Sequence, residues 1–228
     1  MEKGKLYGVG VGPGDPELIT MKAFRLLKEA DVVAVPDKGT GEKTALNIVS
    51  DYVDDSKIQF FPTPMIRDKA ELQRNYEAQA DRICGLLDQG KTVVFITLGD
   101  PTIYSTYYYV HEIVAQRGYE AELIPGVPSF CAVAARLGTS LCERSQRLLI
   151  IPASSSAEDA LQVKANKVFM KAGSGILDLK DKLREAGLLE QAFAVENCSM
   201  ENEKIYARLA DMEEPTGYFS IVVVKEDK

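Results

Sequence analysis

The sequence predicts an α/β protein of two domains, the first built on a parallel sheet and the second on a mixed sheet. Over the first half of the chain, apolar runs of strand length alternate with stretches of helical periodicity, which is the pattern of a parallel sheet with helices on both faces. In the second half the last apolar runs lie close together, with room for one short helix at most. The 228 residues are enough for each half to bury a core of its own.

The first half is expected to contain strands at 5–11, 31–36, 57–62, 91–98 and 119–125, where the apolar runs lie. A helix is expected from Pro16 to about Lys28, because proline suits the first helical position and apolar residues then recur at helical spacing. The same periodicity predicts helices over 44–53, 68–89 and 102–118.

The second half is expected to follow a change of pattern at Pro125 and Gly126. It should contain helices over 128–138 and 176–186, a Ser-rich loop at 154–159, and strands at 146–152, 166–173, 191–199, 203–212 and 217–226. We therefore place a boundary near 118–126, which gives domains 1–120 and 121–228. Because no long linker separates these domains, we expect them to pack closely around a ligand cleft.

Composition excludes several classes of function. The chain is 46% hydrophobic and 27% charged, and no apolar run approaches the roughly 20 residues that cross a bilayer. With no apolar signal segment near the N-terminus, a cytoplasmic protein is expected. The net charge of −7 and the lack of a Lys/Arg run argue against nucleic acid as a partner. Four cysteines without a C-x-x-C pair and a single histidine, His111, favour free thiols and predict no protein-bound metal.

Three loops follow predicted strands of the first domain and combine glycine with proline. They are GVGVGPGD (8–15), TLGDPTIYS (97–105) and IPGVPSF (124–130). Glycine and proline are common in any loop. Three such loops at the carboxyl ends of strands in one parallel sheet, however, favour a ligand site, because ligands of such sheets bind at that edge.

The first loop does not match the common phosphate-binding motifs. In a G-x-G-x-x-G pattern the third glycine would fall at Pro13 or Asp15, and no Gly-Lys-Ser/Thr follows for a P-loop. Asp37, after the second predicted strand, is where a ribose-binding acid lies in dinucleotide folds. A nicotinamide-dependent oxidoreductase therefore stays open as an alternative.

Longer stretches around the three loops resemble a known family. YGVGVGPGDPELITMKAFRLLKEADVV, TLGDPTIYSTYYYV and IPGVPSFCAVAARLG are similar to signatures of the S-adenosylmethionine-dependent tetrapyrrole methylases, and the resemblance covers essentially the whole chain. Within that family, PTPMIRDK (62–69) and the second and third stretches look most like the members that methylate carbon 20 of precorrin-2 or cobalt-precorrin-2 in cobalamin synthesis. The resemblance implies a homodimer of two-domain α/β chains that bind S-adenosylmethionine in the interdomain cleft and a tetrapyrrole substrate.

The resemblance also implies which residues contact the cofactor. Carried over position by position, they are Pro13, Leu98, Gly99, Asp100, Ile103, Pro128, Ser129, Met170, Lys171, Ala207 and Tyr218. Pro128 has no hydroxyl to donate, so Ser129 is the better candidate of that pair.

Methyl transfer from a sulfonium to an electron-rich carbon needs alignment and exclusion of water more than a strong base. A proton must still leave the ring, and Asp100 or Tyr104 is the candidate for assisting it. Asp15, Arg67 and Tyr107 are candidates for contacting the substrate. Each of these residues also has a simpler interpretation. Asp15 and Asp100 precede prolines and can cap helices. Exposed arginines are usually solvated, and tyrosines such as Tyr104 and Tyr107 often pack in cores.

Other functions remain compatible with the same residues. The chain could methylate another tetrapyrrole carbon, or bind a small molecule in the same cleft without turnover. Family members that methylate ribosomal RNA should carry a basic face, which a chain of net charge −7 lacks.

Overall fold

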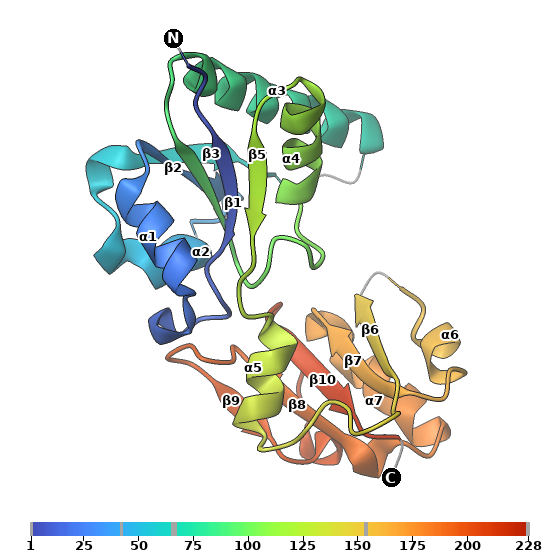
Figure 1. Cartoon of the computed structure of the whole chain (residues 1–228). Coiled ribbons are helices and arrows are strands. Elements are labelled where there is room, and N and C mark those ends of the chain that lie inside the picture. The colour runs from blue at the N-terminus through green and yellow to red at the C-terminus, as the bar shows by residue number, and fades with distance from the viewer. Residues whose placement is uncertain (1, 42, 65–67, 153–154, 227–228) are drawn as a thin grey trace. The chain divides into compact units, whose positions relative to one another are not determined.

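The structure is a computed structural model that describes residues 2–41, 43–64, 68–152 and 155–226 (Figure 1). The chain divides into two compact units, Met1–Pro128 and Ser129–Lys228. The division falls later than the boundary after residue 120 expected from the sequence. The reason is that strand β5 (Ala121–Ile124) pairs with β1 (Leu6–Gly10) and so belongs to the first unit.

The first unit contains a five-stranded sheet in the order β3-β2-β4-β1-β5. Besides β1 and β5, its strands are β2 (Val32–Asp37), β3 (Ile58–Pro62) and β4 (Val93–Thr97). All neighbouring strands run parallel, which confirms the predicted parallel sheet. Parallel strands place their carboxyl ends at one edge, so the loops after β1, β4 and β5 start from the same edge.

Helices cover both faces of this sheet (Figure 1). Val33 and Ile96 pack on one face with helices α1 (Met21–Glu29) and α2 (Thr44–Val49). Ala34 and Phe95, their chain neighbours, pack on the other face with α3 (Lys69–Asp88) and α4 (Tyr107–Gln116). Burial on both faces explains why the strands read as continuous apolar runs.

The first helix begins later than the sequence predicts. Pro16–Leu18 forms a short 3₁₀ turn whose preceding Asp15 carboxylate accepts a hydrogen bond from the Glu17 N–H, 2.8 Å long. Thr20 then caps α1 through the Ala23 N–H, and Met21, the first residue of the helix, is 82% exposed. Likewise α4 begins at Tyr107 rather than at 102.

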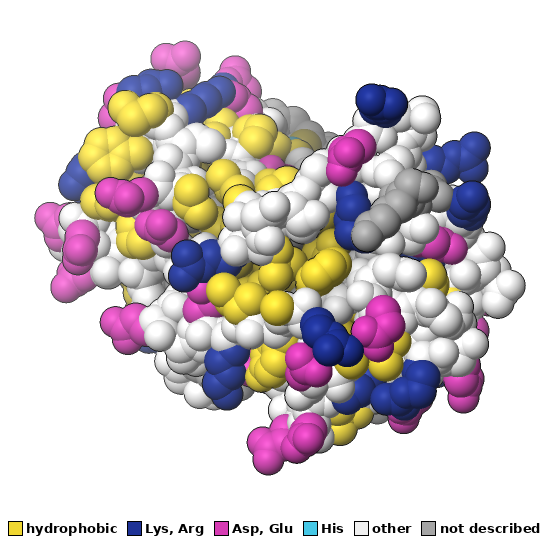
Figure 2. All heavy atoms as spheres, turned by 90° about the horizontal axis from the view of Figure 1, so that it is seen from below, with side chains coloured by type: hydrophobic (Ala, Val, Ile, Leu, Met, Phe, Trp, Pro, Cys, Tyr) yellow, Lys and Arg dark blue, Asp and Glu magenta, His cyan; other side chains and the backbone are white. Residues whose placement is uncertain are grey.

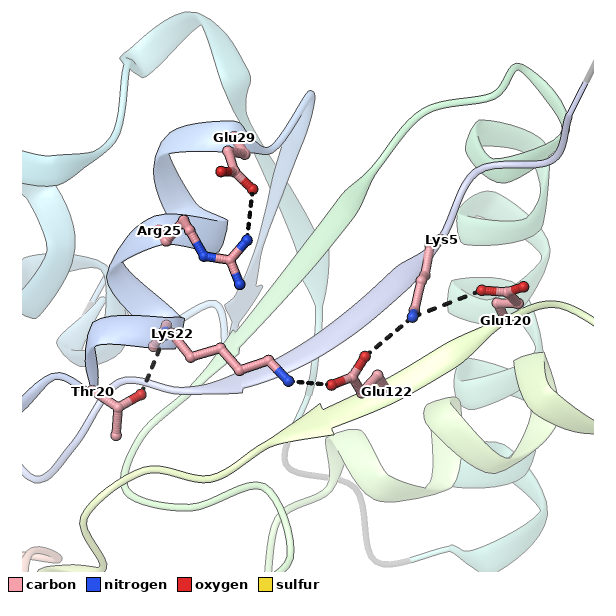
Figure 3. Close-up of polar contacts among 8 residues, drawn as sticks. Lys5, Thr20, Lys22, Arg25, Glu29, Glu120 and Glu122 are labelled. Atoms are coloured by element: carbon pink, nitrogen blue, oxygen red, sulfur yellow. Dashed lines mark hydrogen bonds and ion pairs between the residues drawn. The ribbon is translucent and has the colours of Figure 1, made fainter.

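A chain of surface ion pairs joins α1 to the edge strand β5 (Figure 3). The Glu122 carboxylate lies between the ammonium groups of Lys22 and Lys5, the latter 3.1 Å away, and Lys5 also reaches Glu120 at 3.7 Å. These contacts lower the pKa of Glu122, because both lysines hydrogen-bond to its carboxylate. Exposed pairs of this kind contribute about 0–1 kcal/mol each, so the apolar faces dominate the stability of the unit.

The second unit contains a mixed sheet in the order β6-β7-β10-β8-β9. Its strands are β6 (Leu148–Pro152), β7 (Asn166–Met170), β8 (Ala192–Glu196), β9 (Lys204–Tyr206) and β10 (Ser220–Val224). Strand β6 is parallel to β7, and β10 is antiparallel to both β7 and β8. The predicted mixed sheet is therefore confirmed.

One face of this sheet forms a core with helices α6 (Ala157–Leu161) and α7 (Ile176–Glu185). Helix α5 (Ser129–Arg136) opens the unit and contacts β10. Across the described residues, none of the helices combines the length and hydrophobicity that crossing a bilayer requires.

Candidate functional site

The first and second glycine-rich loops are joined by a pair of backbone hydrogen bonds. The Gly99 N–H donates to the Gly12 carbonyl at 2.7 Å, and the Gly12 N–H donates to the Gly99 carbonyl at 3.3 Å. Both residues have left-handed φ angles, 82° and 71°, which glycine adopts without steric cost. The loops after β1 and β4 are therefore held together at one edge of the sheet.

The third loop packs its backbone directly on the other two. A Cβ atom on Gly126 would lie 2.2 Å from the Gly99 carbonyl oxygen and 2.8 Å from the Gly10 carbonyl oxygen. A Cβ atom on Gly10 would lie 2.5 Å from the same Gly99 oxygen. Glycine is therefore required at 10 and 126 because backbones meet there, and the predicted convergence of the three loops is present within the first unit.

Asp100 ties the second loop to the third. One carboxylate oxygen accepts hydrogen bonds from the N–H and hydroxyl of Thr102, and the other accepts from the Gly126 N–H at 3.0 Å. The side chain is buried, with 8% of its surface exposed. These contacts give Asp100 a structural role in the loop cluster, and its catalytic role stays a prediction.

We expect Asp100→Asn to lower the free energy of unfolding by about 2 kcal/mol, the size of a lost hydrogen bond to a charged group. An amide presents one oxygen, so either Thr102 or Gly126 would lose its acceptor. Urea unfolding measures the change, and Asp51→Asn at an exposed position is the control, expected to stay within about 0.5 kcal/mol of the wild type. A loss at Asp100 no larger than that of the control would contradict the assigned role.

The other predicted residues of these loops differ in exposure. Pro13 and Gly99 are buried, whereas Leu98, Ile103 and Pro128 are half-buried. Tyr104 is 47% exposed and has a φ angle of 48°. A left-handed tyrosine costs of order 1–3 kcal/mol and persists where its surroundings impose it, which is common at ligand sites.

Tyr107, a candidate for substrate contact, lies in the core of the first unit, which agrees with the simpler interpretation and does not support that contact. Its side chain is 3% exposed and lies on the core face of α4 with Val110. A Cβ atom on Gly8 would lie 1.9 Å from the Tyr107 ring, so Gly8 makes room for that ring. The Tyr107 hydroxyl is 3.2 Å from Nδ1 of His111, and burial raises the pKa of the phenol.

Two further candidates for substrate contact were Asp15 and Arg67. Asp15 is half-buried, and its carboxylate caps the turn at Pro16–Leu18. This agrees with the simpler interpretation and leaves substrate contact a prediction. Arg67 lies outside the described residues.

In the second unit, two loops meet at the edge where β7 ends and β10 begins. The Ala172 N–H donates to the Ser220 carbonyl at 3.0 Å, and a Cβ atom on Gly173 would lie 2.9 Å from the Gly217 carbonyl oxygen. The Lys171 ammonium lies 5.7 Å from the ring centroid of Tyr218. The predicted residues Met170, Lys171 and Tyr218 are thus brought together.

Ser129 and Ala207 are the other two predicted residues of this unit. Ser129 is the first residue of α5. Ala207 follows β9, which runs antiparallel to β8. The end of β9 that precedes Ala207 therefore lies toward the beginning of β8. The cluster of Met170, Lys171 and Tyr218 lies beyond the other end of β8.

Sequence reasoning missed two residues of these clusters, Gly126 and Glu196. Gly126 stood within a recognised loop, and its Pro-Gly pair was the available signal. Glu196, the last residue of β8, is 9% exposed and accepts a hydrogen bond from the Gly217 N–H at 2.7 Å. Nothing around it in the sequence distinguishes it from other glutamates.

Charge and metal-ligating groups are dispersed. On the face shown in Figure 2, Lys and Arg side chains are interspersed with Asp and Glu and form no single stripe. In the part of the chain that the structure describes, no three His, Cys, Asp or Glu side chains are placed to hold a metal ion, and the four cysteines are free thiols.

Comparison with known proteins gives a consistent family assignment. Residues 5–213 match the family model for tetrapyrrole (corrin/porphyrin) methylases. A probable cobalt-precorrin-2 C(20)-methyltransferase of Methanocaldococcus jannaschii is 34% identical, over 98% of this chain and 97% of that protein. A precorrin-2 C(20)-methyltransferase of a Sinorhizobium species is 30% identical, over 97% of this chain and 95% of that protein.

A solved methyltransferase structure has a fold similar to that of this chain. The uroporphyrin-III C-methyltransferase of Thermus thermophilus, solved with S-adenosylhomocysteine, superposes with a TM-score of 0.71 at 22% identity. The match covers 98% of each chain.

Proposed function

This chain belongs to the tetrapyrrole (corrin/porphyrin) methylases, and we propose that it transfers a methyl group from S-adenosylmethionine to carbon 20 of precorrin-2 or cobalt-precorrin-2 in cobalamin biosynthesis. The observation that carries the proposal is the full-length similarity to relatives named for that carbon, 34% and 30% identical. One of these relatives is named for the cobalt-loaded substrate and the other for precorrin-2, so the metal content of the ring is left to experiment.

The described residues fit S-adenosylmethionine in their chemistry. The joined loops of the first unit offer closely packed backbone groups and the half-buried apolar side chains of Leu98 and Ile103. We propose that the methionine and ribose parts are held there, with Pro13, Gly99 and Asp100 completing the set. The cluster of Met170, Lys171 and Tyr218 supports the proposed place of the adenine, and Ser129 is proposed to add a hydroxyl. The position of Ala207 does not support a contact from that residue.

When bound, the cofactor would supply an electrophilic methyl group for in-line attack by the ring carbon, and the sulfonium sulfur would leave as the neutral thioether of S-adenosylhomocysteine. The chain's contribution is to hold donor and acceptor in line, which in favourable cases lowers a barrier by about 7–11 kcal/mol. Asp100 contributes by positioning, because its carboxylate holds Thr102 and Gly126 in place. The exposed Tyr104 is the proposed group for assisting loss of the ring proton.

We also propose that the chain works as a homodimer, on the basis of the family resemblance, and in the cytoplasm, on the basis of its composition. Size-exclusion chromatography with light scattering tests the first of these.

The activity is tested by anaerobic incubation of the purified protein with S-adenosylmethionine and precorrin-2, in metal-free and cobalt-loaded forms. Mass spectrometry is expected to show the gain of one methyl group on at least one form. Binding of S-adenosylhomocysteine without any gain would instead favour a binding protein of the same fold.

A further inference from the structure

We propose that Glu196 is a positioning residue, which fixes the loop 216–219 against Lys171 and so shapes the part of the cofactor site formed by the second unit. This inference rests on the proposed function, since the loop is assigned to the cofactor through Tyr218. It adds a residue that neither the sequence pattern nor the family resemblance pointed to.

The Glu196 side chain holds the loop by a single defined contact. Its Oε1 atom accepts the Gly217 N–H at 2.7 Å, and its Oε2 atom is 3.9 Å from the Lys204 ammonium. Because Glu196 is 9% exposed, little water is available to replace it as an acceptor for that N–H.

Gly217 is held on its carbonyl side as well. The Ser220 hydroxyl donates to the Gly217 carbonyl at 2.8 Å, and Gly173 lies close enough that its Cβ would meet the same oxygen. Gly217 is thereby hydrogen-bonded to residues of β8 and β10 and packed against the loop after β7. These contacts also restrict the backbone of Tyr218, the next residue.

The surrounding backbone adopts conformations that need such support. Lys171, Asn197 and Ser199 all have left-handed φ angles, of 59°, 51° and 65°. The Asn197 N–H also donates to the Phe219 carbonyl at 2.9 Å. Left-handed non-glycine residues persist where neighbouring contacts hold them. Lys171 and Asn197 have such contacts with the loop 216–219, whereas the Ser199 N–H donates to Glu203.

If Glu196 were shortened, the Gly217 N–H would lose its acceptor while the sheet itself stayed paired. The loop would then sample other positions, and Tyr218 would no longer be held near Lys171. Affinity for the cofactor should fall, because binding would have to order the loop first. The rate with saturating cofactor should change little.

The test compares Glu196→Ala, Glu196→Gln and the control Glu190→Ala, which removes an exposed carboxylate that pairs with Arg208. We expect Glu196→Ala to speed hydrogen exchange at the Gly217 amide of the ligand-free protein by about tenfold or more. We also expect it to weaken binding of S-adenosylhomocysteine and raise KM for S-adenosylmethionine by about tenfold, with kcat kept within about threefold. Glu196→Gln retains an acceptor oxygen and should restore each quantity to within about threefold of the wild type.

Unchanged exchange at Gly217 in Glu196→Ala would overturn the inference, and so would faster exchange without loss of affinity. A glutamine variant as impaired as the alanine variant would also overturn it, because the acceptor would then not be what matters. Failure of the wild-type protein to bind S-adenosylhomocysteine would instead reject the proposed function, and with it the role of Glu196. The exchange data on ligand-free protein tell these cases apart.

Discussion

Gly126→Ala is expected to weaken binding of S-adenosylhomocysteine by about 100-fold or more. The new methyl group would lie 2.2 Å from the Gly99 carbonyl oxygen and 2.8 Å from the Gly10 carbonyl. Both obstacles are backbone atoms of the loops proposed to hold the cofactor, so the clash is relieved only by moving those loops apart. Overpacking of this kind also costs about 1–3 kcal/mol of stability.

Isothermal titration calorimetry measures the affinity, and thermal unfolding followed by circular dichroism shows whether the variant is folded. Gly85→Ala is the matched control, because Gly85 lies exposed in α3 and a Cβ atom added there would meet nothing within 4 Å. We expect the control to bind normally and to gain about 0.5–1 kcal/mol of stability, since alanine favours a helix over glycine. Affinity of a folded Gly126→Ala protein within about threefold of the wild type would contradict the convergence of the three loops.

Glu226→Ala is expected to destabilise the second unit by about 3–5 kcal/mol. The Lys167 side chain is completely buried and pairs with the Glu226 carboxylate, with the Ala165 carbonyl as a further acceptor at 2.9 Å. Glu226 also accepts the Ala165 N–H at 3.1 Å. Truncating Glu226 would leave a buried ammonium group without its counter-charge, which is far more costly than losing a surface pair.

Urea unfolding measures this loss. Glu29→Ala, which breaks the exposed pair with Arg25, is the control and should cost about 0.5 kcal/mol or less. The double substitution Lys167→Met with Glu226→Gln should recover much of the stability, because an apolar side chain needs no counter-charge. A cost at Glu226 similar to that of the control would show that the ammonium finds another partner.

The strands and the loop edge were predictable because their causes are local or topological. Strand β2, for example, is apolar on both faces, and parallel pairing then places the loops after β1, β4 and β5 at one edge. What the sequence did not reveal is why the glycines are there. At Gly10 and Gly126 the reason is contact between backbones distant in the chain, which no local pattern encodes.

The differences between the predicted and the observed features have equally specific causes. Proline at 16 and the apolar spacing after it are compatible both with one helix and with a short turn followed by a helix capped at Thr20, as observed. Tyr107 is buried against Gly8 and Phe95, whereas Tyr104 is exposed, and the spacing of the tyrosines along the chain does not distinguish the two. Glu196 accepts a hydrogen bond from Gly217, and the two residues come together only because β8 and β10 pair side by side.

The position of the transferred methyl group on the ring decides whether the protein is a C-20 methyltransferase. The protein would be incubated anaerobically with precorrin-2, metal-free or cobalt-loaded, and S-adenosylmethionine carrying ¹³C in its methyl group, and the product examined by NMR. We expect one labelled methyl group, attached to carbon 20 of the ring. A label on any other carbon, or no label in the product of a protein that binds S-adenosylhomocysteine, would contradict this expectation.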